Sequence, residues 1–163
     1  RLGQVDADAD GVSRTDYRLM DGQRVANISL NDVVLNKSQL IGELDQGFSL
    51  MQAVVADATR AICAEAVGIM QKLSETTVEY CKTREQFGTP IGKFQALQHR
   101  MVDMFTAGEQ TRSLLYRAVC STDAESDDAK KDLLALKVMV GRAGKLVGGE
   151  AIQLHGPLEK VVR

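Results

Sequence analysis

The feature that most constrains this chain is a helical spacing of apolar residues, which runs through most of it from about residue 46 onward. In the first stretch, apolar side chains recur in steps of three, four or seven over about 35 to 40 residues, whereas an average helix has about 11. Gly88 and Pro90 interrupt the pattern, a second stretch begins near Phe94 and Gln95, and a third follows the polar residues 121–128. We therefore predict three long helices joined by short links.

Each predicted helix carries one apolar stripe, which marks the face that we expect to be buried. The stripes are Met51, Val55, Ala58, Ile62, Ile69, Leu73 and Tyr80; Phe94, Leu97, Met101, Met104, Gly108, Thr111, Leu115 and Ala118; and Leu133, Leu136, Val140, Ala143, Val147 and Leu154. Three antiparallel helices of this kind predict a mainly α fold, an up-down bundle of the four-helix type with three long helices present. A fourth helix, from a segment outside this chain or from a partner, would complete the bundle.

The third predicted helix, about residues 128–153, is unusually rich in glycine. Gly141, Gly144, Gly148 and Gly149 each cost about 1 kcal/mol relative to alanine in a helix interior. We therefore expect another element to pack very closely against them. The start of this helix has candidate caps in Ser126 and Asp127.

Residues 1–45 show turn signals and short alternating runs in place of helical spacing. Asp21 and Gly22 separate the runs 17–20 and 26–30, and an Asp-Gly pair in this position predicts a β-hairpin. A further apolar run covers residues 33–35. Strands this short cannot bury both faces alone, so we interpret residues 1–45 as the terminal strands of a β domain that this chain does not complete. Residues 46–163 are then a partial helical-bundle domain.

The composition excludes several classes of function. The chain is 44% apolar and its net charge is −2, so its electrostatic field does not favour binding to nucleic acid or to membrane surfaces. No apolar run approaches the roughly 20 residues of a membrane span. Cys63, Cys81 and Cys120 show neither metal-ligand spacing nor a disulfide framework. With no secretory pattern at the start, we predict a cytoplasmic, soluble protein with reduced thiols, of which Cys63 and Cys81 are buried in helices.

Neither the acidic turn nor the histidines support a metal site. Residues 6–11 read Asp-Ala-Asp-Ala-Asp-Gly, like the start of a calcium loop, but Tyr17 stands where the bidentate glutamate belongs. We interpret them as an acidic surface turn. His99 and His155 have no cysteine or acid neighbours at ligand or triad spacing. No metal ion is predicted.

The richest chemistry lies in residues 84–95. Arg84 offers a planar guanidinium fork for a diphosphate, Phe87 offers a ring, and Gln86 and Gln95 offer amides that recognise carbonyl, amine or hydroxyl groups. Together these side chains suit a planar, phosphate-bearing ligand. The alternative is an ordinary helix C-terminus with a favourable cation, followed by a Gly-Pro turn. The residue types alone favour neither interpretation.

Asp57 and Arg60 lie three residues apart on the first predicted helix, and therefore share a face. Taken alone, they are best interpreted as a surface ion pair worth less than about 1 kcal/mol. Glu65, which stands among alanines and valine, is a helix-surface or interhelical charge.

Several motifs together resemble the acyl-CoA dehydrogenase flavoproteins. Residues 84–91 read R-E-Q-F-G-T-P-I and residues 94–98 read F-Q-A-L-Q, where the family pattern is R-x-Q/T-F-G-x-P-I followed by F/H-Q. Residues 151–156, A-I-Q-L-H-G, resemble its Q-x-H-G-G segment. Residues 42–51 resemble the entry to its helical domain, and residues 21–35 the last strands of its middle β-barrel domain. The resemblance covers nearly the whole chain.

The resemblance implies a flavin enzyme whose cofactor is FAD. In this family a glutamate removes the α-proton of an acyl-CoA thioester and the β-hydride passes to the flavin, which gives the trans-2-enoyl-CoA. Electrons then leave to an electron-transferring flavoprotein. The resemblance also implies a homo-oligomer, a dimer or tetramer, with FAD at the subunit interface.

The resemblance further implies roles for individual residues. Arg84 is similar to the arginine that meets the diphosphate of the neighbouring subunit's FAD. The other residues expected at the cofactor are Gln86, Phe87, Phe94, Gln95, Gln153 and Gly156. Asp57 and Arg60 are expected to contact the acyl-CoA substrate.

The catalytic residue stays unassigned. Thr59 stands where some family members carry the glutamate, and most members carry it beyond the segment that residues 151–156 resemble. Residues 157–160 read P-L-E-K in place of a glycine-rich continuation, and we do not assign Glu159 as the base. Two alternatives to an enzyme follow. One is a non-catalytic subunit that completes a partner's FAD site in a hetero-oligomer, and the other is a helical interaction module without flavin.

Overall fold

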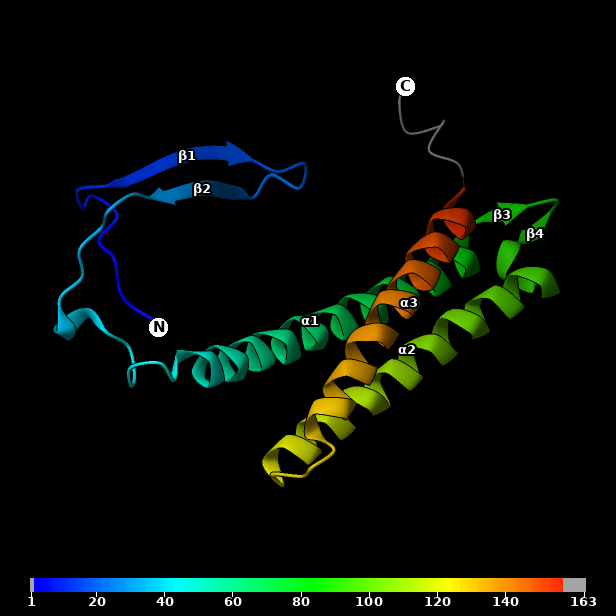
Figure 1. Cartoon of the computed structure of the whole chain (residues 1–163). Helices are drawn as coiled ribbons and strands as arrows, with labels where there is room; N and C mark the ends of the chain where they lie inside the picture. Colours follow the sequence, from blue (N-terminus) through cyan, green and yellow to red (C-terminus); the bar gives the residue numbers. More distant parts are fainter. Residues whose placement is uncertain (1, 157–163) are drawn as a thin grey trace. The chain divides into compact units, whose positions relative to one another are not determined.

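The computed structural model describes residues 2–156, and the chain divides into two compact units, residues 1–54 and 55–163. The main element of the first unit is an antiparallel hairpin of β1 (Val12–Arg18) and β2 (Arg24–Leu30), drawn in blue in Figure 1. Its turn is closed by the Leu19 amide, which donates to the Gln23 carbonyl over 3.0 Å. Gly22 has a φ of +83°, which glycine adopts without steric cost. The hairpin predicted around Asp21 and Gly22 is confirmed.

The run at residues 33–35 does not form a strand. Asp32 has a φ of +54°, so the chain turns out of the ladder directly after β2. The segment continues to a short 3-10 helix, η1 (Lys37–Gln39), where the Asn36 amide donates to the Gln39 side chain over 2.9 Å. The strand predicted from the apolar residues 33–35 is therefore wrong, because the left-handed Asp32 ends the pairing between β1 and β2.

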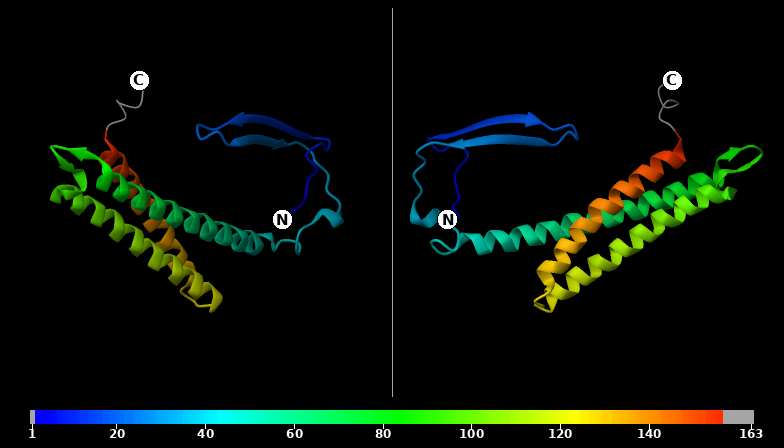
Figure 2. Two further views of the ribbon diagram at one scale, coloured as in Figure 1. Left: turned by 180° about the vertical axis from the view of Figure 1, so that it is seen from behind. Right: turned by 45° about the vertical axis from the view of Figure 1, so that its right-hand side comes forward.

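Three long helices follow, α1 (Gly47–Thr83), α2 (Gln95–Asp123) and α3 (Ala129–His155). Figure 2 shows α2 and α3 side by side in opposite directions, with α1 against them. The prediction of a mainly α, bundle-type fold with three long helices is confirmed. Asp128 precedes α3 without a side-chain cap, and the Ser126 hydroxyl instead accepts the Asp128 amide over 3.3 Å. The prediction that Ser126 or Asp127 caps this helix is therefore wrong, because the N-cap position is Asp128 and it makes no side-chain cap hydrogen bond.

The helices enclose two apolar clusters, each with members from all three helices. The larger consists of Val67, Met70, Cys81, Met104, Ala107, Ala143, Val147, Ala151 and Leu154. The smaller consists of Cys63, Ala118, Leu133 and Leu136. The α3 stripe is buried as predicted, except for the half-buried Val140. The α2 stripe is buried at Met104, Thr111 and Ala118 and is otherwise half-buried, apart from the exposed Phe94. Burial of the Cys63 and Cys81 thiols is confirmed.

The stripe predicted for α1 is largely wrong. Met51, Val55, Ile62 and Ile69 are between 44% and 65% exposed. The face that packs on α2 and α3 instead carries Cys63, Val67, Met70, Thr77 and Cys81. It lies about 100° around the helix, one residue on from the predicted stripe. The prediction followed the largest aliphatic side chains, whereas close packing of three helices selected smaller and more adaptable ones.

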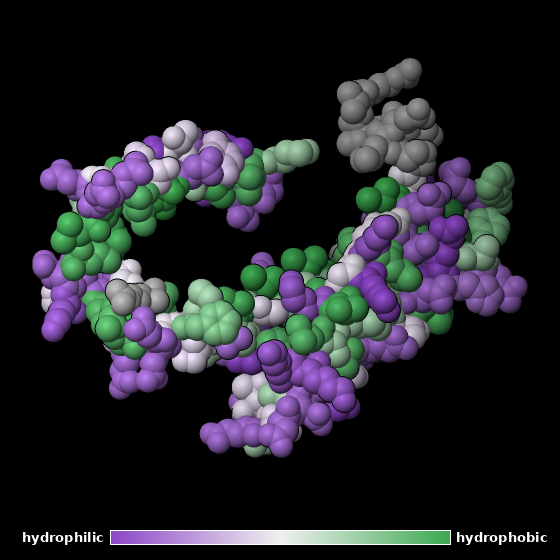
Figure 3. Space-filling view, in the orientation of Figure 1, coloured by the Kyte–Doolittle hydropathy of each residue, from purple (hydrophilic) through white to green (hydrophobic). Residues whose placement is uncertain are grey.

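The expectation of close packing at the α3 glycines is also wrong for the described residues. A Cβ added at Gly141, Gly144, Gly148 or Gly149 would meet no heavy atom within 4 Å. Other apolar residues on the helices also remain exposed, and Figure 3 shows hydrophobic side chains on the visible face of the helices. Within residues 2–156, no helix has the length and apolar character needed to cross a membrane.

Candidate functional site

The connection from α1 to α2 is a small hairpin that the sequence did not reveal. Strands β3 (Glu85–Gln86) and β4 (Thr89–Pro90) pair antiparallel. The two turn residues, Phe87 and Gly88, have φ angles of +55° and +75°. Positive φ at both central positions is typical of the type I′ turn, which normally takes Asn-Gly or Asp-Gly. Phenylalanine in the first position concealed the signal.

Phe87 combines a strained backbone with an exposed ring. The left-handed conformation costs a residue with a side chain about 1–2 kcal/mol. The ring is 94% exposed, and its ring contact is the edge of Phe94, with centroids 6.2 Å apart and planes at 80°. Strain of this kind clusters at ligand-binding and active sites. The observation therefore favours a ligand at this corner over an ordinary turn.

Arg84 has a fixed backbone and an exposed side chain. Its amide donates to the Tyr80 carbonyl over 2.9 Å, and its carbonyl accepts the Ile91 amide over 2.8 Å. Among the described residues, no ion pair engages its guanidinium. Gln86 and Gln95 are also exposed, and the Gln86 amide donates to the neighbouring Glu85 carbonyl over 2.7 Å. This corner therefore presents a guanidinium and two amides on an anchored loop.

Gly92 fixes the loop against α1. It lies in η2 (Ile91–Lys93), and an added Cβ would stand 3.0 Å from the Cys81 carbonyl oxygen. Cys81 is fully buried, so a side chain at position 92 would have to push against a packed part of α1, and glycine allows the close approach without such a shift. Burial also raises the pKa of the Cys81 thiol.

The end of α3 reaches the same corner through an aromatic stack. The rings of Tyr80 and His155 lie 4.3 Å apart at 23°, and the Tyr80 hydroxyl donates to the His155 carbonyl over 3.3 Å. Tyr80 precedes Arg84 by one helical turn. Gly156 caps α3 with a φ of +92°. The predicted cofactor residues near the two ends, residues 84–95 and 153–156, are thereby brought to one end of the helical unit.

The role of this stack was missed from the sequence. Tyr80 belonged to an apolar stripe and His155 to a short motif, and nothing in the spacing of the two residues indicated contact. An aromatic residue one turn before the Arg84 motif was the available signal. Because the stack joins two segments predicted to bind one cofactor, Tyr80 and His155 are candidate positioning residues.

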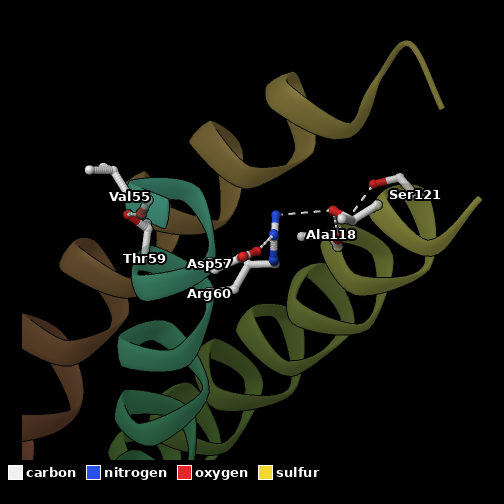
Figure 4. A network of polar contacts seen from close by, with 7 residues as sticks. Val55, Asp57, Thr59, Arg60, Ala118 and Ser121 are labelled. Atoms are coloured by element: carbon white, nitrogen blue, oxygen red, sulfur yellow. Dashed lines mark hydrogen bonds and ion pairs between the residues drawn. The ribbon is translucent and has the colours of Figure 1, made fainter. Parts of the chain in front are cut away.

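The predicted substrate residues, Asp57 and Arg60, lie on α1, and Figure 4 shows them from close by. The Arg60 side chain is 19% exposed, pairs with Asp57, and donates to the Thr122 hydroxyl over 3.2 Å. Arg60 therefore helps to hold α1 against the end of α2. Thr59 donates its hydroxyl to the Val55 carbonyl over 2.7 Å, a bond within its own helix.

The two groups of predicted site residues are far apart. Arg60 lies in α1, and Arg84 directly follows the last residue of that helix, 24 positions further along the chain. At 1.5 Å per residue the separation is about 36 Å. The structure therefore does not bring Asp57 and Arg60 together with the 84–95 corner, and a single ligand molecule of ordinary size cannot contact both.

Other reactive groups in the described residues offer no alternative centre. No three histidine, cysteine, aspartate or glutamate side chains converge as metal ligands within residues 2–156. In the acidic turn the Asp8 amide donates to the Asp6 carboxylate over 3.1 Å. Burial raises the pKa of the Cys63 thiol, an effect that Lys137 partly opposes, so this thiol is a poor nucleophile. Glu65 and His99 are exposed on their helices, whereas Glu159 lies outside the described residues.

Comparison with known proteins identifies the family of this chain. Residues 45–158 match the model of the acyl-CoA dehydrogenase C-terminal domain. A 3-(aryl)acrylate reductase of Clostridium sporogenes is 32% identical over 93% of this chain and 41% of its own length. The L-prolyl-[peptidyl-carrier protein] dehydrogenase of a Serratia species is 35% identical over 80% of this chain and 34% of its own.

A solved structure of PigA with FAD and proline is similar over 93% of this chain and 40% of that one, with 32% identity and a TM-score of 0.88. This chain thus spans about 34–41% of the length of these relatives. The family model alone matches well over half of the chain. The chain belongs to the acyl-CoA dehydrogenase family.

Proposed function

We propose that this chain is the C-terminal portion of an FAD-dependent dehydrogenase that converts an acyl-CoA thioester to the trans-2-enoyl thioester. The observation that carries the proposal is the corner at residues 84–95, where an exposed ring on a strained turn stands near Arg84, whose guanidinium has no ion pair among the described residues. When bound, FAD would supply the acceptor for the substrate hydride. The chain's own residues would bind and orient this cofactor.

The side chains at the corner suit distinct parts of FAD. The Arg84 guanidinium matches the paired oxygens of a diphosphate. Phe87 and Phe94 offer apolar ring surface to the planar groups, and Gln86 and Gln95 offer donors and acceptors for hydroxyl and carbonyl groups. Gln153 and Gly156, held nearby by the Tyr80–His155 stack, would complete the set.

The separation within α1 supports a subunit interface. Asp57 and Arg60 are the proposed substrate contacts, and they stand about 36 Å from Arg84. We infer that one chain serves two active sites, with its substrate helix at one flavin and its 84–95 corner at a neighbouring subunit's flavin. This requires a dimer or tetramer, and an electron-transferring flavoprotein is the proposed electron acceptor.

A second candidate is a non-catalytic subunit that completes a partner's FAD site. The observation that favours it is the absence of an assigned base among residues 2–156, where the Thr59 hydroxyl is engaged by the Val55 carbonyl. We also expect the 163-residue chain alone to form no enoyl-CoA, because it spans only about 34–41% of the length of its relatives and flavin and substrate would need the other domains. A helical module without flavin would differ from both candidates, because its full-length gene product would purify colourless and would not take up FAD.

The proposal is tested by replacing Arg84 with alanine in the full-length gene product. Loss of a charge-assisted hydrogen-bonded pair is expected to weaken FAD binding about 10- to 100-fold, measured by flavin fluorescence during dialysis. Arg142→Ala is the matched control, because Arg142 is an exposed arginine of α3, remote from residues 84–95 in sequence. Unchanged FAD retention in Arg84→Ala would refute the assignment.

A further inference from the structure

An ion pair ties the end of α3 to the beginning of α2. The Arg100 guanidinium contacts the Glu150 carboxylate over 2.8 Å, and the two side chains are 43% and 30% exposed. The residues are 50 positions apart in the sequence, so the contact exists only once the helices have packed. A second ion pair between the same helices, Arg117 with Asp132 over 2.9 Å, lies about 26 Å further along α2, near the turn that joins them.

Glu150 directly follows the part of α3 with the weakest helix propensity. Gly148 and Gly149 precede it, and glycine is the least favourable helix residue apart from proline. A Cβ at either glycine would meet no heavy atom within 4 Å, so no other element packs closely against these two positions. We therefore expect the direction of the last turns of α3 to depend on contacts that residues 150–155 make with α1 and α2.

Three kinds of contact hold these last turns. Leu154 is buried in the larger apolar cluster, the Tyr80–His155 stack ties the turns to α1, and the Arg100–Glu150 pair ties them to α2. Figure 1 shows this end of α3 at the same end of the helical unit as β3 and β4. Apolar burial is not directional, whereas a charge-assisted hydrogen bond has a defined geometry. The ion pair is therefore the contact that can fix the end of α3 relative to α2.

We propose that Arg100 and Glu150 are positioning residues for the flavin site. Gln153 lies three residues after Glu150 and shares its face of α3, and residues 84–95 lead directly into α2, which carries Arg100. The ion pair holds Gln153 and Gly156 at a fixed place relative to residues 84–95. An ion pair that has lost part of its hydration adds little stability, and fixing one arrangement is its best-attested use. The inference rests on the proposed function, in which both segments bind one FAD.

The test measures FAD affinity by flavin fluorescence, as FAD is titrated into the flavin-free full-length gene product. Arg100→Glu places two carboxylates opposite each other, and Glu150→Arg places two guanidinium groups opposite each other. Each reversal is expected to weaken FAD binding about tenfold, and the exchanged pair Arg100→Glu, Glu150→Arg should recover most of the loss. Urea unfolding of the flavin-free variants measures their stability separately.

Arg117→Glu is the matched control. It disrupts the other ion pair between α2 and α3, and it changes the net charge by the same amount as Arg100→Glu. We expect it to lower the urea midpoint, because its partner Asp132 is only 5% exposed, and to leave the FAD affinity unchanged. A loss of affinity equal to that of Arg100→Glu would mean that any loosening between α2 and α3 weakens binding, and it would overturn the positioning role.

The two reversals separate position from charge, because they change the net charge in opposite directions. If Arg100 acted on the diphosphate through its charge, Glu150→Arg would tighten FAD binding, and that result would overturn the inference. Unchanged affinity in both reversals, or an exchanged pair as weak as either reversal, would contradict it as well. The proposed function fails separately, if Arg84→Ala keeps its FAD affinity. Weaker binding in Arg84→Ala without any loss in the reversals would refute the role of the ion pair alone.

Discussion

Replacing Phe87 with asparagine should separate the stability of the fold from binding at the corner. The substitution creates Asn-Gly, the preferred pair for a type I′ turn, and relieves a left-handed conformation that costs about 1–2 kcal/mol. It also removes the edge contact with Phe94, worth at most about 0.5–1.5 kcal/mol and less here because the Phe87 ring is 94% exposed. The free energy of unfolding should therefore stay constant or rise by up to about 1 kcal/mol.

The same substitution should weaken FAD binding. Losing the ring contact is expected to cost about 1–2 kcal/mol, a factor of about 5–30 in affinity. Urea unfolding of the flavin-free protein measures the first quantity, and flavin fluorescence measures the second. Phe105→Asn is the control, because Phe105 is an exposed ring on α2 outside the corner, and its FAD affinity should be unchanged. If Phe87→Asn lost stability and kept full FAD affinity, the ring would be structural and the reasoning would fail.

Other predictions concern the core and the thiols. Leu136→Ala, at a fully buried site, should cost about 2–5 kcal/mol in urea unfolding, and a loss below 1 kcal/mol would contradict the packing described. Gly92→Ala should cost about 1–3 kcal/mol and weaken FAD binding by displacing the loop; unchanged affinity would show that the contact with Cys81 does not position the corner. Cys120 should react rapidly with a thiol reagent and the two buried cysteines slowly, and uniform rates would contradict their burial. Burial raises the folded-state pKa of the Cys63 and Cys81 thiols. The contribution of these neutral thiols to the free energy of unfolding is therefore full below about pH 8.5, and it is lost as the pH rises through the raised pKa values. Urea denaturation midpoints that do not decrease as the pH rises through that alkaline range would contradict this prediction.

The number, length and order of the helices were predictable, because apolar spacing and the breaks at Gly88 and Pro90 are local properties of the sequence. The buried face of α1 was not predictable in the same way. It depends on which of two adjacent apolar stripes fits against α2 and α3, and the packing chose the face of Cys63 and Val67 over that of Ile62 and Ile69. Tertiary fit decides such cases, and spacing alone cannot.

The candidate site was predictable in its residue types and not in its geometry. Arg84 and Phe87 stood out by their chemistry, but the left-handed turn and the exposed ring became visible only in three dimensions. The Tyr80–His155 stack joins residues 75 positions apart, a distance at which local patterns carry no information. Asp57 and Arg60 were rightly expected to pair, whereas the contact of Arg60 with Thr122 required the packed helices.

The most direct measurement is complementation between two impaired variants of the full-length gene product. Arg84→Ala damages the corner and Arg60→Ala damages the proposed substrate contact, so each alone should be nearly inactive toward the acyl-CoA that best bleaches the wild-type flavin. When the two are co-expressed, random pairing gives mixed dimers in which one of two sites is intact, and activity should recover to about one quarter of wild type. Activity no higher than the mean of the two variants would show that both residues serve the same chain's site, and would contradict a flavin site shared between subunits.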